Sequence, residues 1–126
     1  MKLEDQVCSL DLAKKLKELG VKQESYFTWY QGIGGVWYLG DPAESMNNAV
    51  EIGHTTAPQF NFVAAFTVAE LGEMLPLNHY TMRNQWEQWT PCNDERALPS
   101  ESAPTEADTR AKMLIYLLEN KLINLN

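Results

Sequence analysis

The chain has 126 residues, of which 44% are apolar and 10% aromatic, the length and composition of one ordinary globular domain. Seventeen acids against ten bases give a formal charge of −7, and the 21% of charged residues is too low a share for a disordered chain with this apolar content. No apolar run approaches the roughly 18 residues that span a bilayer, so the composition excludes a membrane protein, a collagen and a coiled-coil rod.

The N-terminal residues and the cysteines indicate a protein of the cytoplasm. Acids stand at Glu4 and Asp5, where a secretory signal peptide carries a basic segment followed by an apolar one. Cys8 and Cys92 are the only cysteines, and they show no redox or metal-binding spacing. We therefore expect both thiols to be reduced rather than joined in a disulfide.

The first predicted element is a helix over residues 10–19. Ser9 is placed to cap this helix, and apolar residues recur at helical spacing from Leu12 to Leu19. Gly20 then supplies the left-handed residue that ends the helix.

A β-hairpin is expected next. Residues 26–30 are almost all aromatic or β-branched, residues 31–35 include three glycines, and residues 36–39 are again apolar and aromatic. Residues 41–59 are polar and interrupted by prolines and a glycine, which predicts a long surface loop or a short irregular helix. The apolar residues 60–66 are expected to form a short strand that leads into the next helix.

The second helix has the clearest start signal in the chain. Thr67 and Glu70 have the spacing of a capping box, and Phe66 and Leu71 have that of the hydrophobic staple that accompanies such boxes. Pro76 bars the helix from continuing.

The rest of the chain is predicted to hold one extended segment, one mobile loop and one long helix. Residues 82–90 are interpreted as extended, and residues 91–104, with three prolines and several acids and serines, as the loop. The last helix opens at Thr105 with capping-box spacing to Asp108, and residues 113–118 are apolar nearly all round. This pattern predicts a central core helix, or a helix shared with a second subunit.

The predicted elements occur in the order α-β-β-α-β(β)-α. Helices packed on one face of a small antiparallel sheet satisfy this order, so we expect a single α+β domain over residues 1–126. The sequence contains neither internal repeats nor low-complexity tracts.

Charge is unevenly distributed along the chain. Residues 1–22 sum to +1, residues 23–82 carry six acids and no lysine or arginine, and residues 83–126 sum to −2. Because neutralisation of phosphates supplies much of nucleic-acid affinity, the long stretch without a cation disfavours a nucleic-acid partner. The basic cluster is interpreted as a solvated helix face. It consists of Lys14, Lys15 and Lys17.

The residues that carry chemistry predict no active site. His54 and His79 are the only histidines, and neither has the neighbouring ligand that a zinc site requires. A hydrolase that pairs His79 with Cys92 is left open, although the spacing does not favour it. The carboxylates include no pair that the sequence fixes on rigid elements, and the glycines at 32–35 lack the lysine of a P-loop. We expect no catalytic residue, no cofactor and no metal.

Aromatic residues are the one surplus, and they lie on predicted strands. Core packing accounts for most of them, but an exposed remainder, bordered by acidic loops, is suited to a protein contact or a dimer face. The candidate interaction surface consists of Tyr26, Trp29, Tyr30, Trp37, Tyr38, Trp86 and Trp89.

Four segments carry a resemblance to a known group of proteins. They are LEDQVCSL at 3–10, LKELGVKQES at 16–25, AFTVAELGE at 65–73 and the helix from Thr105 to Ile123. These segments resemble small uncharacterised proteins encoded by phages, prophages and related mobile elements. The resemblance implies a phage-associated bacterial setting and carries over no catalytic residue.

The sequence favours a non-enzymatic accessory protein of a mobile element that acts through contacts with a protein partner, a second copy of itself included. Alternatives from other classes are left open. Residues 9–21 loosely resemble the first helix and turn of a helix-turn-helix module, but the β-forming residues 26–30 stand where its recognition helix belongs. The acidic middle segment also permits a decoy that mimics DNA and inhibits a host enzyme.

Overall fold

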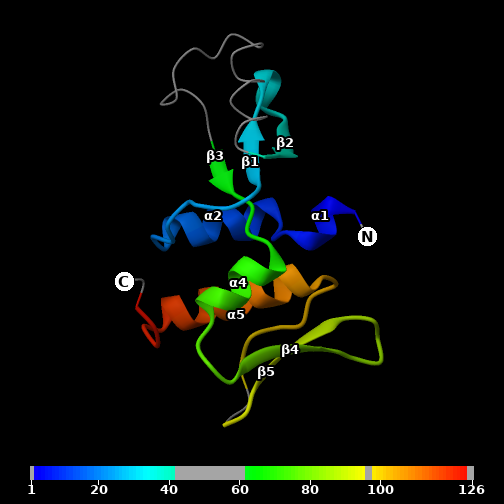
Figure 1. Ribbon diagram of the computed structural model, residues 1–126, viewed down its shortest axis with the longest axis vertical. Coiled ribbons are helices and arrows are strands. Elements are labelled where there is room, and N and C mark those ends of the chain that lie inside the picture. The colour runs from blue at the N-terminus through cyan, green and yellow to red at the C-terminus, as the bar shows by residue number, and fades with distance from the viewer. Residues whose placement is uncertain (1, 42–61, 96–97, 125–126) are drawn as a thin grey trace.

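The computed structural model describes residues 2–41, 62–95 and 98–124, and it places a layer of helices between two small antiparallel sheets (Figure 1). The helices are α1 (Leu3–Gln6), α2 (Leu10–Glu18), α4 (Val68–Met74) and α5 (Glu106–Glu119), with a single 3-10 turn, η1 (Ile33–Gly35). The strands are β1 (Thr28–Gln31), β2 (Trp37–Gly40), β3 (Phe62–Ala64), β4 (His79–Arg83) and β5 (Trp89–Asn93). The predicted α+β class and the order of elements are confirmed. The loop expected over residues 41–59, which includes His54, lies outside the described residues except for Asp41.

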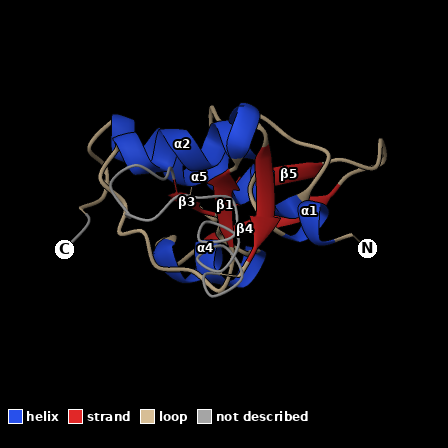
Figure 2. Ribbon diagram, turned by 90° about the horizontal axis from the view of Figure 1, so that it is seen from above, coloured by secondary structure: helices blue, strands red, loops and turns tan. Residues whose placement is uncertain are grey.

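The strands divide into two sheets, where the sequence suggested one. β1 is the centre of a three-stranded sheet of order β2-β1-β3, and β4 and β5 form a separate hairpin. The β3 strand packs against α2, whereas β4 and β5 pack against α5. Seen from above, α2 and α4 run along opposite sides of the molecule, with α1 at the end away from the C-terminus (Figure 2).

The short α1 helix was not predicted, whereas α2 begins at Leu10 as predicted and ends at Glu18, one residue earlier than expected. The start of α2 is capped differently from the prediction. Gly20 follows the helix with φ +90°, as expected of the residue that ends it. The Ser9 side chain makes no capping hydrogen bond. Instead the backbone N–H of Ser9 donates to the Asp108 carboxylate at 2.7 Å. The start of α2 is therefore tied to the start of α5, a contact between residues too distant in sequence for a local pattern to reveal.

The capping box of α4 forms as predicted. The Thr67 hydroxyl accepts the backbone N–H of Glu70 at 3.1 Å, and the Glu70 carboxylate accepts the backbone N–H of Thr67 at 2.9 Å. Phe66 and Leu71, the predicted staple pair, are both buried in the core. The helix ends at Met74, ahead of Pro76.

Residues 82–90 do not form one extended segment. They contain the end of β4, a turn and the start of β5. The Asn84 side chain makes the turn, since its Oδ1 accepts the backbone N–H groups of Trp86 and Gln88. The interpretation of residues 91–104 as a loop is likewise wrong at its start, because β5 continues to Asn93 and pairs with β4 throughout.

The α5 helix is the central core helix that the sequence predicts. Its buried residues cover most of its circumference and leave only the side of Lys112 and Glu119 towards solvent: Ala107, Thr109, Ala111, Met113, Leu114, Ile115 and Leu117. The apolar ones pack with Leu16 of α2, Leu71 of α4 and Val63 of β3 in one core. Both cysteines are free thiols, as expected, and Cys8 lies inside this core. None of the described helices has the length and hydropathy needed to cross a membrane.

Candidate functional site

The seven aromatic residues of the predicted interaction surface are divided between the two sheets. Tyr26, Trp29, Tyr30, Trp37 and Tyr38 lie on or beside β1 and β2, whereas Trp86 and Trp89 belong to the β4–β5 hairpin. The two sheets lie on opposite sides of the helical layer (Figure 1). The structure therefore does not gather these residues into one continuous surface.

Trp29 and Trp37, the two tryptophans of the first sheet, pack against the core. The Trp29 indole N–H donates to the backbone carbonyl of Cys8 at 3.0 Å, and the Trp37 ring lies under the ammonium of Lys14 at 4.8 Å. The burial of both rings identifies this face of the sheet as a packing face.

The tyrosines of this sheet lie on the other face. Tyr30 and Tyr38 are cross-strand partners with ring centroids 5.6 Å apart, and Tyr30 is buried while Tyr38 is half exposed. Tyr26, just before β1, is largely exposed. Among the described residues, the exposed aromatic side chains at this end are therefore Tyr26 and Tyr38.

The predicted basic cluster is engaged within the molecule. Besides the contact of Lys14 with Trp37, the Lys15 ammonium pairs with Glu119 at 3.5 Å, and the Lys17 ammonium donates to the Phe62 carbonyl at 2.8 Å. These contacts fit the interpretation of the cluster as an ordinary helix face.

The β4–β5 hairpin has one packed face and one open face. Alternation along β4 sends the side chains of His79, Thr81 and Arg83 to one face and those of Tyr80 and Met82 to the other. Thr81 marks the packed face, because its hydroxyl donates to the Glu106 carboxylate at the start of α5. Tyr80 and Met82 therefore point away from the helices.

Large exposed apolar side chains concentrate on this hairpin. Half of those found in the described residues fall within residues 77–86: Leu77 is 91% exposed, Tyr80 40%, Met82 56% and Trp86 74%. We call these four residues the hairpin face. Tyr80 and Met82 share the open face of β4, Leu77 precedes this strand and Trp86 lies in the turn that follows it. A segment rich in exposed apolar side chains is a frequent contact site, whereas single exposed apolar residues are common on any surface.

The His79–Cys92 pair that would make a hydrolase is not assembled. Cys92 is the cross-strand partner of Tyr80, so its side chain leaves the sheet on the face opposite to that of His79. The imidazole contacts the Asn93 amide at 3.1 Å, while the Cys92 thiol donates to the Thr90 carbonyl at 3.6 Å. Burial, and secondarily the charge of Asp94, raises the pKa of the Cys92 thiol, which disfavours the nucleophilic thiolate.

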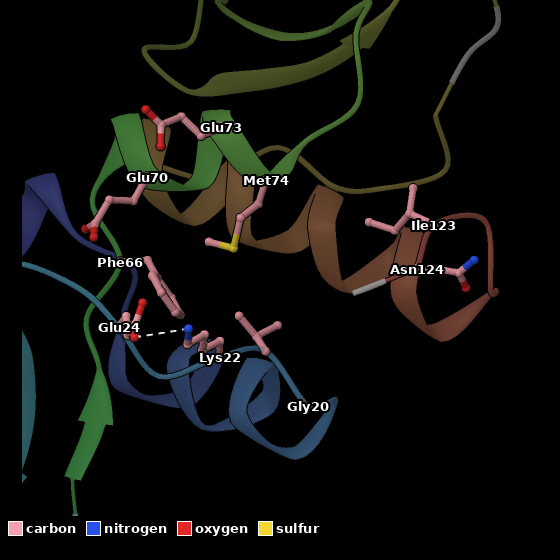
Figure 3. Close-up of a pocket in the computed structure, with 10 residues that line it drawn as sticks. Gly20, Lys22, Glu24, Phe66, Glu70, Glu73, Met74, Ile123 and Asn124 are labelled. Carbon is pink, nitrogen blue, oxygen red and sulfur yellow. Dashed lines mark ion pairs between the residues drawn. The ribbon is translucent and has the colours of Figure 1, made fainter. Parts of the chain in front are cut away.

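A pocket of about 540 Å³ lies between the end of α2, the α4 helix and the residues after α5 (Figure 3). Its lining combines the apolar Val21, Phe66, Met74 and Ile123 with the polar Lys22, Glu24, Glu70, Glu73 and Asn124, and with Gly20. Lys22 and Glu24 pair with each other at 3.2 Å (Figure 3).

The carboxylate of Glu70 is a structural tether at the edge of this pocket. Besides the Thr67 amide, it accepts the Ser25 hydroxyl at 2.8 Å and the Tyr26 backbone N–H at 3.3 Å. Glu70 thereby fastens the segment before β1 to the start of α4. With Glu24 paired and Glu70 occupied, the pocket offers no pair of free carboxylates for acid–base chemistry.

The exposure of the β4 side chains was not predicted from the sequence. Its signal was the alternation of polar and apolar residues in HYTMR, residues 79–83, which is typical of a half-exposed strand.

Within the described ranges, no three metal-ligating side chains come close enough to hold an ion. Comparison of the chain with protein-family models, curated proteins and solved structures finds no match.

Proposed function

We propose that this protein is a non-enzymatic accessory protein that acts by binding another protein, and that the hairpin face makes the contact. The single observation that carries the proposal is the concentration of exposed Leu77, Tyr80, Met82 and Trp86 within residues 77–86, which lead into the hairpin and form its first strand and turn. Tryptophan and tyrosine are the residues that most often dominate binding energy at protein interfaces, since they bury a large area with few rotatable bonds.

The way the hairpin is held supports this use. The packed face is anchored to α5 through Thr81 and through the hydroxyl of Thr109, which donates to the Trp89 carbonyl at 2.9 Å. A contact surface on an anchored strand pair is pre-ordered, so binding loses less conformational entropy than it would on a loose segment. The resemblance to phage- and prophage-encoded proteins supports an accessory role in a mobile element.

Charges around the hairpin favour a basic partner. Glu87 lies in the turn, and Asp94 and Glu95 follow β5. Asp94 raises the pKa of the Tyr80 hydroxyl, mainly through its charge, and thus lies close to the hairpin face. Basic residues at the rim of a partner would be attracted to this border and would hasten association.

Affinity capture with matched variants tests the proposal. The bait is the whole chain, and the test variant is Tyr80→Ala/Trp86→Ala, which removes two exposed rings without touching the core. Tyr26→Ala/Tyr38→Ala removes the two exposed rings of the other sheet and is the matched control. A partner protein identified with the wild type should lose binding by roughly tenfold or more with the hairpin variant only. Equal binding by wild type and hairpin variant would disprove the proposal.

A further inference from the structure

The outer edge of β5 is closed. The backbone N–H and C=O of Trp89 both bond to Ala103, at 2.8 and 3.2 Å, on the side away from β4. Two residues further along, Pro91 has no N–H to offer there. This strand is therefore unable to pair with an additional strand along that edge.

The outer edge of β4 is open. Because Trp89 directs its backbone away from β4, its cross-strand partner Arg83 also directs its backbone groups away from β5. The backbone bonds between Asn84 and Gln88 and between Asn78 and Asp94 fix the same alternation at both ends of the hairpin. The backbone groups of His79, Thr81 and Arg83 therefore point outward. Of these, only the His79 N–H has a backbone partner in the described chain, the Pro76 carbonyl at 3.3 Å.

The other sheet manages its edges differently. On β3 the Gln23 side chain accepts the Ala64 N–H at 2.8 Å, and the Lys17 ammonium occupies the Phe62 carbonyl. On β2 the backbone groups of Tyr38 and Gly40 point towards β1 and bond to Tyr30 and Thr28. Only Trp37 and Leu39 of β2 therefore have outward backbone groups. Among the described strands, β4 offers the longest run of outward backbone groups, and such an edge readily accepts another strand.

We propose that a second copy of this chain pairs with β4 in antiparallel fashion about a two-fold axis at Thr81. The pairing would join the two hairpins into one sheet of order β5-β4-β4-β5. Thr81 would bond to Thr81 of the partner subunit in both directions, and the Arg83 N–H would bond to the carbonyl of the partner subunit's His79. The outward residues are spaced symmetrically about Thr81, which is the self-complementarity that a two-fold interface requires.

Charge complementarity favours a second copy of this chain as the partner that pairs with the open edge of β4. The β4 strand contains no acid and ends in Arg83, while its beginning lies beside Asp94, whose N–H bonds to the Asn78 carbonyl. Antiparallel pairing brings the cationic end of each strand to the acidic end of the other, although each chain carries −7. The two Glu106 carboxylates that bond to Thr81 near the axis are each paired with Arg110 of their own chain. Tyr80 would lie opposite Met82 of the partner subunit, which extends the apolar surface across the axis.

This inference rests on the same hairpin as the proposed function, but the two fail separately. Edge pairing leaves the hairpin face uncovered and doubles its area, so a dimer would present two copies of the contact surface side by side. A monomeric protein that still captures a partner through Trp86 would refute the dimer alone. A dimer that binds no partner through this face would refute the proposed function alone.

The test compares two substitutions at one position by the mass of the whole chain in solution. Wild type should have twice the mass of the 14.3 kDa chain at high micromolar concentration and dissociate on dilution. Arg83→Pro removes an outward N–H that has no partner within the described chain, and proline is tolerated on such an edge. It should weaken dimerisation by at least about tenfold. Arg83→Ala, which keeps the N–H, is the matched control and should still form the dimer.

Amide hydrogen exchange of the wild type supplies a second measurement that needs no variant. The Thr81 amide should be protected in concentrated solution and exchange rapidly on dilution, while the Tyr80 amide, which bonds to β5, should stay protected in both. A wild type that is monomeric at high micromolar concentration would overturn the inference. So would a dimer that Arg83→Pro leaves intact, or a Thr81 amide whose exchange does not depend on concentration.

Discussion

Glu70 ends the first turn of α4 with both of its carboxylate oxygens occupied. It accepts hydrogen bonds from Thr67, Ser25 and Tyr26, so one side chain both caps the helix and holds the segment that leads into β1. We predict that Glu70→Ala lowers the free energy of unfolding by about 1–3 kcal/mol, because three donors lose a charged acceptor. Glu73→Ala, three residues further on the same helix and exposed, is the control and should change it by less than about 0.5 kcal/mol. Urea unfolding of both variants measures the difference.

The two thiols differ in accessibility. Cys8 is fully buried, and burial raises its pKa to about 12, whereas Cys92 is only partly buried and its pKa is raised less. A thiol reagent should therefore label Cys92 in the folded protein and reach Cys8 only after unfolding, with a Cys92 rate that still rises above pH 9. Labelling of wild type, Cys8→Ala and Cys92→Ala, followed by mass spectrometry, measures this. Rapid labelling of native Cys92→Ala would contradict the burial of Cys8.

The raised pKa of Cys8 also gives stability a pH dependence of known sign. In the unfolded chain the thiol ionises near its ordinary value of 9.0, whereas in the folded protein it stays protonated until about pH 12. Its contribution to stability is therefore fully present below pH 9 and is lost as the pH rises from about 9 towards 12. We predict that the unfolding free energy of wild type falls more steeply with pH over this window than that of Cys8→Ala. Parallel slopes in urea titrations would show that Cys8 ionises equally in both states.

At the scale of the elements, Gly72 reverses the usual effect of glycine in a helix. Replacing an interior helical glycine by alanine normally stabilises a helix by up to about 1 kcal/mol. A Cβ at Gly72, however, would overlap the guanidinium of Arg110, which donates to the Val68 carbonyl at 3.0 Å and pairs with Glu106. We predict that Gly72→Ala destabilises the protein by roughly 1–3 kcal/mol, since Arg110 has to leave its place between α4 and α5.

A double-mutant cycle isolates this clash. In an Arg110→Ala background the space beside Gly72 is vacant, so the same Gly72→Ala substitution should become neutral or stabilising. Thermal unfolding of the four proteins gives the coupling. Equal effects of Gly72→Ala in the two backgrounds would mean that Arg110 is not what restricts this position.

Elements whose signals are local were predictable from the sequence. The Thr67–Glu70 box and the Gly20 stop each involve residues within one turn of each other, and both form as expected. The bond from Ser9 to Asp108 joins residues 99 positions apart, and no local pattern encodes it. The turn at Asn84 was missed although its cause is local, because hydrophobic periodicity across residues 82–90 outweighed the side-chain-to-backbone bonds of a single asparagine.

The candidate surface shows the same limit on a larger scale. Aromatic content alone identified seven residues, but which of them are exposed depends on how the strands divide into sheets. Trp29 and Trp37 pack against the core, where Trp29 bonds to the Cys8 carbonyl and Trp37 lies under Lys14 of α2, whereas Trp86 lies exposed in the turn of the hairpin. Tyr80 was overlooked because the start of β4 was assigned to no strand, and Met82, although inside the predicted extended segment, is not aromatic.

At the scale of the whole molecule, one buried hydroxyl joins the β5 edge of the β4–β5 hairpin to the helical core. Thr109 of α5 is fully buried, and its Oγ1 accepts the Ala103 N–H at 3.2 Å and lies 2.9 Å from the Trp89 carbonyl to which it donates. Ala103 and Trp89 in turn bond to each other, so the hydroxyl secures both chains at the edge of the hairpin. The Thr81 hydroxyl still links β4 to Glu106 and Arg110 of α5, so the β5 edge of the hairpin is the part that should loosen when the Thr109 attachment is lost.

We predict that Thr109→Val, which keeps the shape of the side chain but removes the hydroxyl, lowers the unfolding free energy by about 1–2 kcal/mol and loosens the hairpin selectively. The Trp89 and Ala103 amides should then exchange faster relative to the Leu114 amide in the middle of α5. Thr109→Ser is the matched control: it keeps the hydroxyl, loses about 1 kcal/mol through the missing methyl group, and should leave the ratio of hairpin to helix exchange unchanged. If Thr109→Val and Thr109→Ser accelerate hydrogen exchange at all three amides to the same extent, the hairpin and the helix unfold together. The Thr109 hydroxyl would then have no special part in joining them.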